Sequence, residues 1–137
     1  LGFIEDFNIN NKKECVLLSG ESFEVSFTAR ASARIEDPIF ALRIRDFRGQ
    51  EVYGTNTKYL GIETPLLEKG DSVLIKFTQK ANLGKGRYFV SLGFTFYEEM
   101  NLRIVHRLRE CMEMEVVNKD EFFGLSNCFS KVTISMN

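Results

Sequence analysis

The segment 38–57, PIFALRIRDFRGQEVYGTNT, carries the pattern of two strands joined by a tight turn. In its first half, the apolar residues Phe40, Leu42 and Ile44 alternate with small or basic residues, which is the period of a half-buried strand. The residues DFRG at 46–49 suit a type I turn followed by a glycine, and the remaining residues form the returning strand. The sequence therefore predicts a β-hairpin whose apolar face belongs to the core.

The same period of two recurs along the chain, and no stretch has the period of a helix. Clear alternation is found at 22–30, 73–78, 87–97 and 109–117, and weaker strand signals are found at 3–9, 15–18 and 128–136, while 102–108 fits either a strand or a loop. Turn residues separate these segments. We therefore predict an all-β domain, a two-sheet antiparallel sandwich of about eight to ten strands.

Composition limits the class of protein further. A chain of 137 residues is most simply one domain, and it buries enough surface to fold without disulfides or metal. Its net charge of −1 argues against a nucleic-acid partner, since nucleic-acid binders usually carry a basic stripe. The three cysteines show no CxxC spacing, so free thiols in a reducing compartment are expected. Because the chain begins at Leu1 rather than Met, we expect it to be a piece of a larger protein.

The motifs of common enzymes and metal sites are missing from the sequence. The only histidine, His106, lies in a charged segment and is expected at the surface or at a sheet edge. No serine lies in a G-x-S-x-G pattern, and GKG at 84–86 lacks the rest of a phosphate-binding loop. The densest acidic stretch, with Glu110, Glu113 and Glu115, has no calcium-loop spacing and is expected to be a solvated strand face.

One set of side chains suggests binding. If the strands that begin near Pro38, Arg87 and Arg109 lie in one sheet, its outer face carries planar hydrogen-bonding groups and an aromatic ring around a dip at Gly93. Such groups can bond to sugar hydroxyls and stack on a sugar ring. The plainer alternative is an ordinary wet sheet face with cross-strand arginine–glutamate pairs. The candidate sugar contacts are Arg43, Arg45, Ser91, Thr95, Tyr97 and Glu113, with Glu115 on the same face.

Two groups of residues carry a family likeness. The first is in the hairpin and comprises Pro38, the alternating Ile39–Asp46, Gly49, Val52, Tyr53 and Gly54–Thr57. The second is an L-x-x-G-x-Y pattern made by Leu83, Gly86 and Tyr88. Together they resemble the signature of the C-terminal domain of Wzt-type proteins, the nucleotide-binding subunits of ABC transporters that export O-antigen polysaccharide.

This resemblance implies an immunoglobulin-like β-sandwich that binds carbohydrate and is not an enzyme. The domain would recognise the finished, often end-modified O-antigen polysaccharide in the cytoplasm, at the inner face of the bacterial inner membrane, where the transmembrane exporter subunit lies. The resemblance assigns ATP and Mg²⁺ to an upstream ATPase domain only, so no cofactor is expected here.

The resemblance also carries two structural expectations. In the family such domains can form homodimers that exchange the C-terminal strand, which here would be Phe129–Met136. The segment Gly54–Thr57 is expected to be structural. Gly54 would permit an unusual backbone, and the short polar side chains after it would bond to local backbone groups.

Two other functions fit the sequence. A β-sandwich that binds a protein partner, or a second copy of itself, through an exposed edge strand would need no glycan contacts. It would leave the outer face a plain, salt-bridged surface. A glycan-modifying enzyme would need a pair of carboxylates in a cleft.

Overall fold

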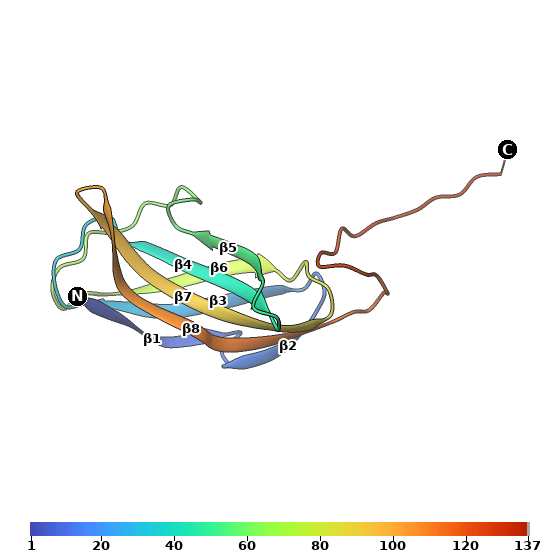
Figure 1. Cartoon of the computed structure of the whole chain (residues 1–137), viewed down its shortest axis with the longest axis horizontal. Helices are drawn as coiled ribbons and strands as arrows, with labels where there is room; N and C mark the ends of the chain where they lie inside the picture. The colour runs from blue at the N-terminus through green and yellow to red at the C-terminus, as the bar shows by residue number, and fades with distance from the viewer. Residues whose placement is uncertain (137) are drawn as a thin grey trace.

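The computed structural model describes residues 1–136 and shows eight strands in two packed sheets (Figure 1). The predicted all-β sandwich is confirmed. The strands are β1 (Gly2–Ile9), β2 (Glu14–Leu18), β3 (Ser22–Ala31), β4 (Ile39–Asp46), β5 (Glu51–Asn56), β6 (Ser72–Lys80), β7 (Gly86–Glu98) and β8 (Asn101–Val117). Residues 1–136 contain no helix that is long and apolar enough to cross a membrane.

The smaller sheet has the strand order β1–β3–β6, and the larger has the order β2–β8–β7–β4–β5. Neighbouring strands run antiparallel, as predicted, with the exception of β2, which pairs in parallel with β8 and places Glu14 opposite Glu113. The exception follows from the chain path, because a tight turn leads from β1 in one sheet to β2 at the edge of the other. Asn10 and Asn11 adopt φ values of 47° and 66° in this turn, a left-handed conformation that asparagine tolerates.

The core is a layer of apolar side chains between the two sheets. Phe27 of β3, Phe40 of β4 and Phe94 of β7 are each at most 1% exposed. The ring centres of Phe27 and Phe40 are 6.2 Å apart, and those of Phe40 and Phe94 are 5.1 Å apart, so inclined ring contacts add to the gain from burial. Leu42 and Ile44 are also buried, which confirms the predicted inward face of the hairpin.

The carboxylate of Asp46 closes the turn between β4 and β5. Its Oδ1 accepts hydrogen bonds from the backbone N–H groups of Arg48 and Gln50, both at 2.9 Å. Gly49 lies between them with a φ of 82°, and its N–H donates to the carbonyl of Asp46 at 3.0 Å. The predicted turn with a glycine in the left-handed region is therefore confirmed.

The segment 54–57, at the far end of β5, bonds to nearby backbone groups as expected. The Oγ1 of Thr57 accepts the N–H of Phe40 at 3.1 Å, and the Oδ1 of Asn56 accepts the N–H of Tyr59 at 2.8 Å. The expectation of an unusual backbone at Gly54 is wrong, because this residue lies in β5 opposite Arg43 without a positive φ. A Cβ at Gly54 would lie at an ordinary contact distance of 3.5 Å from the Cγ of Arg43, so neither the backbone nor the space around it requires glycine at this position.

The segment 102–108 is part of β8, so it is a strand rather than a loop. The pairing of β8 with β7 shifts register twice, between Val90 and Leu92 and between Phe94 and Thr95; such bulges bend and twist a strand. His106 lies on the part of β8 beyond β2, which is a sheet edge, as expected. Its Nδ1 accepts the N–H of Ile4 at 2.8 Å and so ties the edge of one sheet to the other.

The predicted last strand at 128–136 is not formed within this chain. The N–H of Asn127 still donates to the carbonyl of Asn82 at 3.2 Å, but the following residues lead away from the sandwich (Figure 1). Val132, Ile134 and Met136 are 82%, 87% and 95% exposed. The apolar alternation is present, but in residues 1–136 no strand edge lies beside this segment to pair with it.

We expect the replacement Thr57→Val to lower the free energy of unfolding by about 1–3 kcal/mol, because the buried N–H of Phe40 loses its acceptor. Chemical denaturation monitored by circular dichroism measures this loss. Thr57→Ser, which keeps the hydroxyl, is the control and should retain most of the stability. Equal losses for the two variants would contradict a role for the hydrogen bond.

The three cysteines are free and differ in exposure: Cys15 and Cys111 are partly buried, and Cys128 is exposed. Burial raises the pKa of the Cys15 thiol and raises that of Cys111 to about 11. With this pKa, about one Cys111 thiol in a thousand is ionised at about pH 8. The thiolate is the form of cysteine that reacts, so Cys111 should react slowly.

We therefore expect the folded chain to react with iodoacetamide fastest at Cys128 and slowest at Cys111. Mass spectrometry of the peptides at successive times measures the three rates. In guanidinium chloride the three rates should converge, because unfolding removes the difference in burial. If Cys111 is modified as fast as Cys128 in the folded chain, the burial argument is wrong.

Candidate functional site

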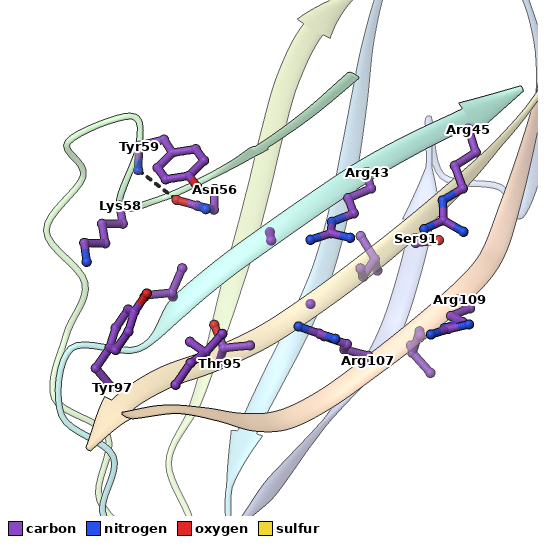
Figure 2. Close-up of a pocket in the computed structure, with 16 residues that line it drawn as sticks. Arg43, Arg45, Asn56, Lys58, Tyr59, Ser91, Thr95, Tyr97, Arg107 and Arg109 are labelled. Atoms are coloured by element: carbon purple, nitrogen blue, oxygen red, sulfur yellow. Dashed lines mark hydrogen bonds between the residues drawn. The ribbon is translucent and has the colours of Figure 1, made fainter. Parts of the chain in front are cut away.

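The outer face of the larger sheet is hollowed over β4, β7 and β8 (Figure 2). The hollow has a volume of about 240 Å³. Its floor consists of small residues, since Ala41 on β4 lies opposite Gly93 on β7 and Ser91 lies two residues away on the same strand. A Cβ at Gly93 would touch only the Cβ of Ala41, at an ordinary 3.5 Å. The space above Gly93 is therefore open to a ligand.

Basic side chains surround this floor, and no acidic residue lies among the described residues that line it. Arg43 and Arg45 extend from β4, Arg107 and Arg109 extend from β8, and Lys58 follows β5. Figure 2 shows the arginines on both sides of β7. The two arginines of β4 alternate with core residues, so burial of the apolar face of β4 directs both of them outward.

The arginines differ in their partners. The Oε1 of Glu51 lies 3.1 Å from Arg43 Nη1 and 3.4 Å from Arg45 Nη2, so one carboxylate serves both. The Nε of Arg45 is buried without a hydrogen-bond partner among residues 1–136. Neither Arg107 nor Arg109 forms an ion pair in this part of the chain. The guanidinium groups of Arg107 and Arg109 therefore keep their donors available.

Aromatic side chains occupy the other end of the hollow (Figure 2). Tyr59 is 80% exposed, and its N–H is held by Asn56, whereas Tyr97 is 48% exposed. The Nζ of Lys58 lies 4.4 Å from the centre of the Tyr97 ring, a cation–π contact that covers part of this ring. Tyr59 therefore offers the more open surface for stacking.

A second hollow of about 830 Å³ continues from the first, and the two share Ile39, Lys58 and Tyr97 as lining residues. Asp37 and Glu63 are its acidic residues. Together the two hollows form a groove that has an arginine end and an aromatic middle.

Five of the six predicted contacts line the first hollow, namely Arg43, Arg45, Ser91, Thr95 and Tyr97. The hydroxyl oxygen of Ser91 already accepts the N–H of Glu110 at 2.8 Å. Glu113 does not line the hollow: it lies opposite Phe89 and pairs with Arg87 at 2.5 Å. Which of these side chains contact a ligand stays a prediction.

Sequence reasoning missed five polar lining residues, which are Asn56, Lys58, Tyr59, Arg107 and Arg109. A usable signal for Arg107 and Arg109 is that residues two apart on a strand share a face. For Arg109 the signal is present, because it lies in the predicted strand 109–117 on the face of Glu113. For Arg107 it is missing, because 102–108 fits either a strand or a loop. Lys58 and Tyr59 lie in an irregular segment after a strand, where no periodicity of the sequence indicates which way a side chain points.

Metal binding and glycoside hydrolysis would each need acidic or metal-ligating side chains gathered in one place. None of residues 1–136 forms a group of three or more His, Cys, Asp or Glu side chains arranged to hold a metal ion. A glycoside hydrolase needs two carboxylates beside the scissile bond. The described lining of the first hollow has neither Asp nor Glu, and the two carboxylates of the groove, Asp37 and Glu63, line the second hollow. What the hollow offers is hydrogen-bond donors, positive charge and aromatic surface.

Comparisons with known proteins agree with this fold. The sequence model of the Wzt C-terminal domain matches residues 4–128. A crystal structure of the C-terminal domain of wzt has a TM-score of 0.85 at 19% identity and covers 98% of this chain and 86% of that one. A Niemann-Pick type C2 protein from the Japanese carpenter ant has a TM-score of 0.59 at 12% identity and covers 85% of this chain and 93% of that one. No curated protein sequence matches the chain.

Proposed function

Because this chain belongs to the Wzt C-terminal domain family, which serves the ABC exporters of O-antigen polysaccharide, we propose that it binds that polysaccharide and does not modify it. The observation that carries the proposal is the hollowed outer face of the larger sheet. A flat face of salt-bridged side chains would not distinguish a glycan-binding domain from a protein-interaction domain. A groove with an open floor favours a ligand that is a chain of sugars.

The groove offers the three contacts that a sugar chain needs. The floor of Ala41 and Gly93 lets a pyranose ring approach the sheet closely, and the exposed ring of Tyr59 provides a stacking surface. Guanidinium and amide groups around the floor hydrogen-bond to hydroxyl and ring oxygens. The second hollow takes the next sugar along the chain. A short glycan would bind weakly, because ordering sugars and side chains costs much of the contact energy.

In this proposal the bound part of the glycan is its non-reducing end, often modified, which is presented before transport. The domain would act in the cytoplasm, at the inner face of the inner membrane, with the transmembrane exporter subunit as partner of the full-length protein. ATP and Mg²⁺ would bind an upstream ATPase domain, and the groove itself needs no cofactor.

We expect Gly93→Leu to weaken binding of the O-polysaccharide from the organism that encodes the chain by at least about tenfold, because the new side chain fills the floor. Isothermal titration calorimetry of the purified chain measures the change. Thr28→Leu, on the outer face of the smaller sheet, is the matched control. If the unaltered chain gives no binding, the glycan proposal fails. If the two variants bind alike, the site is not this hollow.

We further propose that two copies of this chain form a homodimer by exchange of the segment Phe129–Met136. Strand β6 ends the smaller sheet and has a free edge. Beside it runs an apolar groove of about 400 Å³, whose lining includes Ile62, Pro65, Ile75 and Phe77. A partner's segment can add to this edge as a strand and cover its exposed apolar side chains.

We expect the unaltered chain to be a dimer at about 100 µM and the chain truncated after Phe129 to be a monomer, because truncation removes the exchanged strand. Ile134→Pro should also give monomers, since proline removes a backbone donor and an apolar side chain. Thr133→Ala, on the other side of the segment, should leave the dimer intact. Size-exclusion chromatography with light scattering measures the masses, and a dimeric truncated chain would refute strand exchange.

A further inference from the structure

The charge of the chain is unevenly distributed. The whole chain has a net charge of −1, yet five of its eighteen lysines and arginines line the first hollow, and its nineteen acidic residues all lie outside that lining. A neutral sugar does not need this distribution, because serine, asparagine and backbone groups bind hydroxyls without net charge. Gathered cations repel one another, so the arrangement favours a ligand that supplies negative charge.

The arginines on the strands also differ in whether they pair with a carboxylate. Arg30, Arg87 and Arg103 each pair with a glutamate elsewhere on the sheets. Arg43 and Arg45 share one glutamate at the rim of the hollow. Among the strand residues described, only Arg107 and Arg109 are arginines without a carboxylate partner. Both line the hollow, opposite the arginines of β4.

Because arginines of β8 that lack a carboxylate partner among residues 1–136 face the arginines of β4 across the hollow, we propose that the bound part of the polysaccharide carries an anionic group, a carboxylate or a phosphate. This proposal rests on the proposed function. The anion lies over Gly93 and Ser91, between the arginines of β4 and those of β8 (Figure 2). Guanidinium groups bind such oxyanions through two parallel hydrogen bonds. The oxygen of Ser91 accepts the N–H of Glu110, so its own proton is free to be donated to the anion.

The arginine end and the aromatic middle of the groove then have separate tasks. The arginine end binds the anion and decides which glycan is accepted, while Tyr59 stacks on a neighbouring sugar whatever its charge. The exporter would thereby select polysaccharides that carry an acidic sugar or a phosphate at the bound position. A reaction that adds this anionic group must precede binding.

The test compares three forms of the same O-polysaccharide: native, carboxyl-reduced with carbodiimide and borohydride, and dephosphorylated with hydrofluoric acid. We expect the native form to bind and one of the two treatments to weaken binding at least about tenfold, which identifies the anion. Binding of the native form should also weaken as salt rises from about 50 to about 500 mM.

Variants locate the anion on the protein. Arg107→Gln and Arg109→Gln should each weaken binding of the native form about tenfold and have little effect on the neutralised form. Arg103→Gln is the matched control, because Arg103 lies on the same strand but outside the hollow and pairs with Glu98. It should bind as the unaltered chain does.

The outcomes separate the two proposals. If no form of the polysaccharide binds, glycan binding itself fails. If all three forms bind equally and Arg107→Gln behaves like Arg103→Gln, the glycan proposal stands and the anion proposal is overturned.

Discussion

The packing of phenyl rings between the two sheets is the interaction on which the binding face depends. Phe40 and Phe94 meet in the core from neighbouring strands, and side chains on a strand alternate strictly between faces. Once these rings are buried, the residues beside them are committed to the outer face. Arg43, Ser91 and Gly93 therefore lie together because of what the opposite face of each strand buries.

This coupling explains which features could be predicted. The core of β4 and β7 and the direction of Arg43, Arg45, Ser91, Thr95 and Tyr97 follow from a period of two, which needs only local sequence. The parallel pairing of β2 with β8 cannot be predicted from local sequence, because it depends on where a turn takes the chain in three dimensions.

The failures have physical causes of the same kind. Glu113 has the right alternation within its own strand, but the register shift between Val90 and Leu92 separates it from the residues opposite Gly93, and it lies beyond the hollow with Arg87. Segment 128–136 has the alternation of a strand, but a strand exists only where another backbone accepts its hydrogen bonds. A single sequence shows neither the register in which two strands pair nor whether a second copy of the chain supplies a strand edge.

The register shifts of β8 also allow the side chains on the binding face to change without a change in the core. A bulge accommodates an additional residue on one strand while the ladder on either side is kept. Gain or loss of one residue near Glu110 would therefore present a different set of side chains above Gly93 and leave the phenyl core undisturbed. The fold thus separates what keeps it stable from what it recognises, so that its specificity can evolve while the scaffold persists.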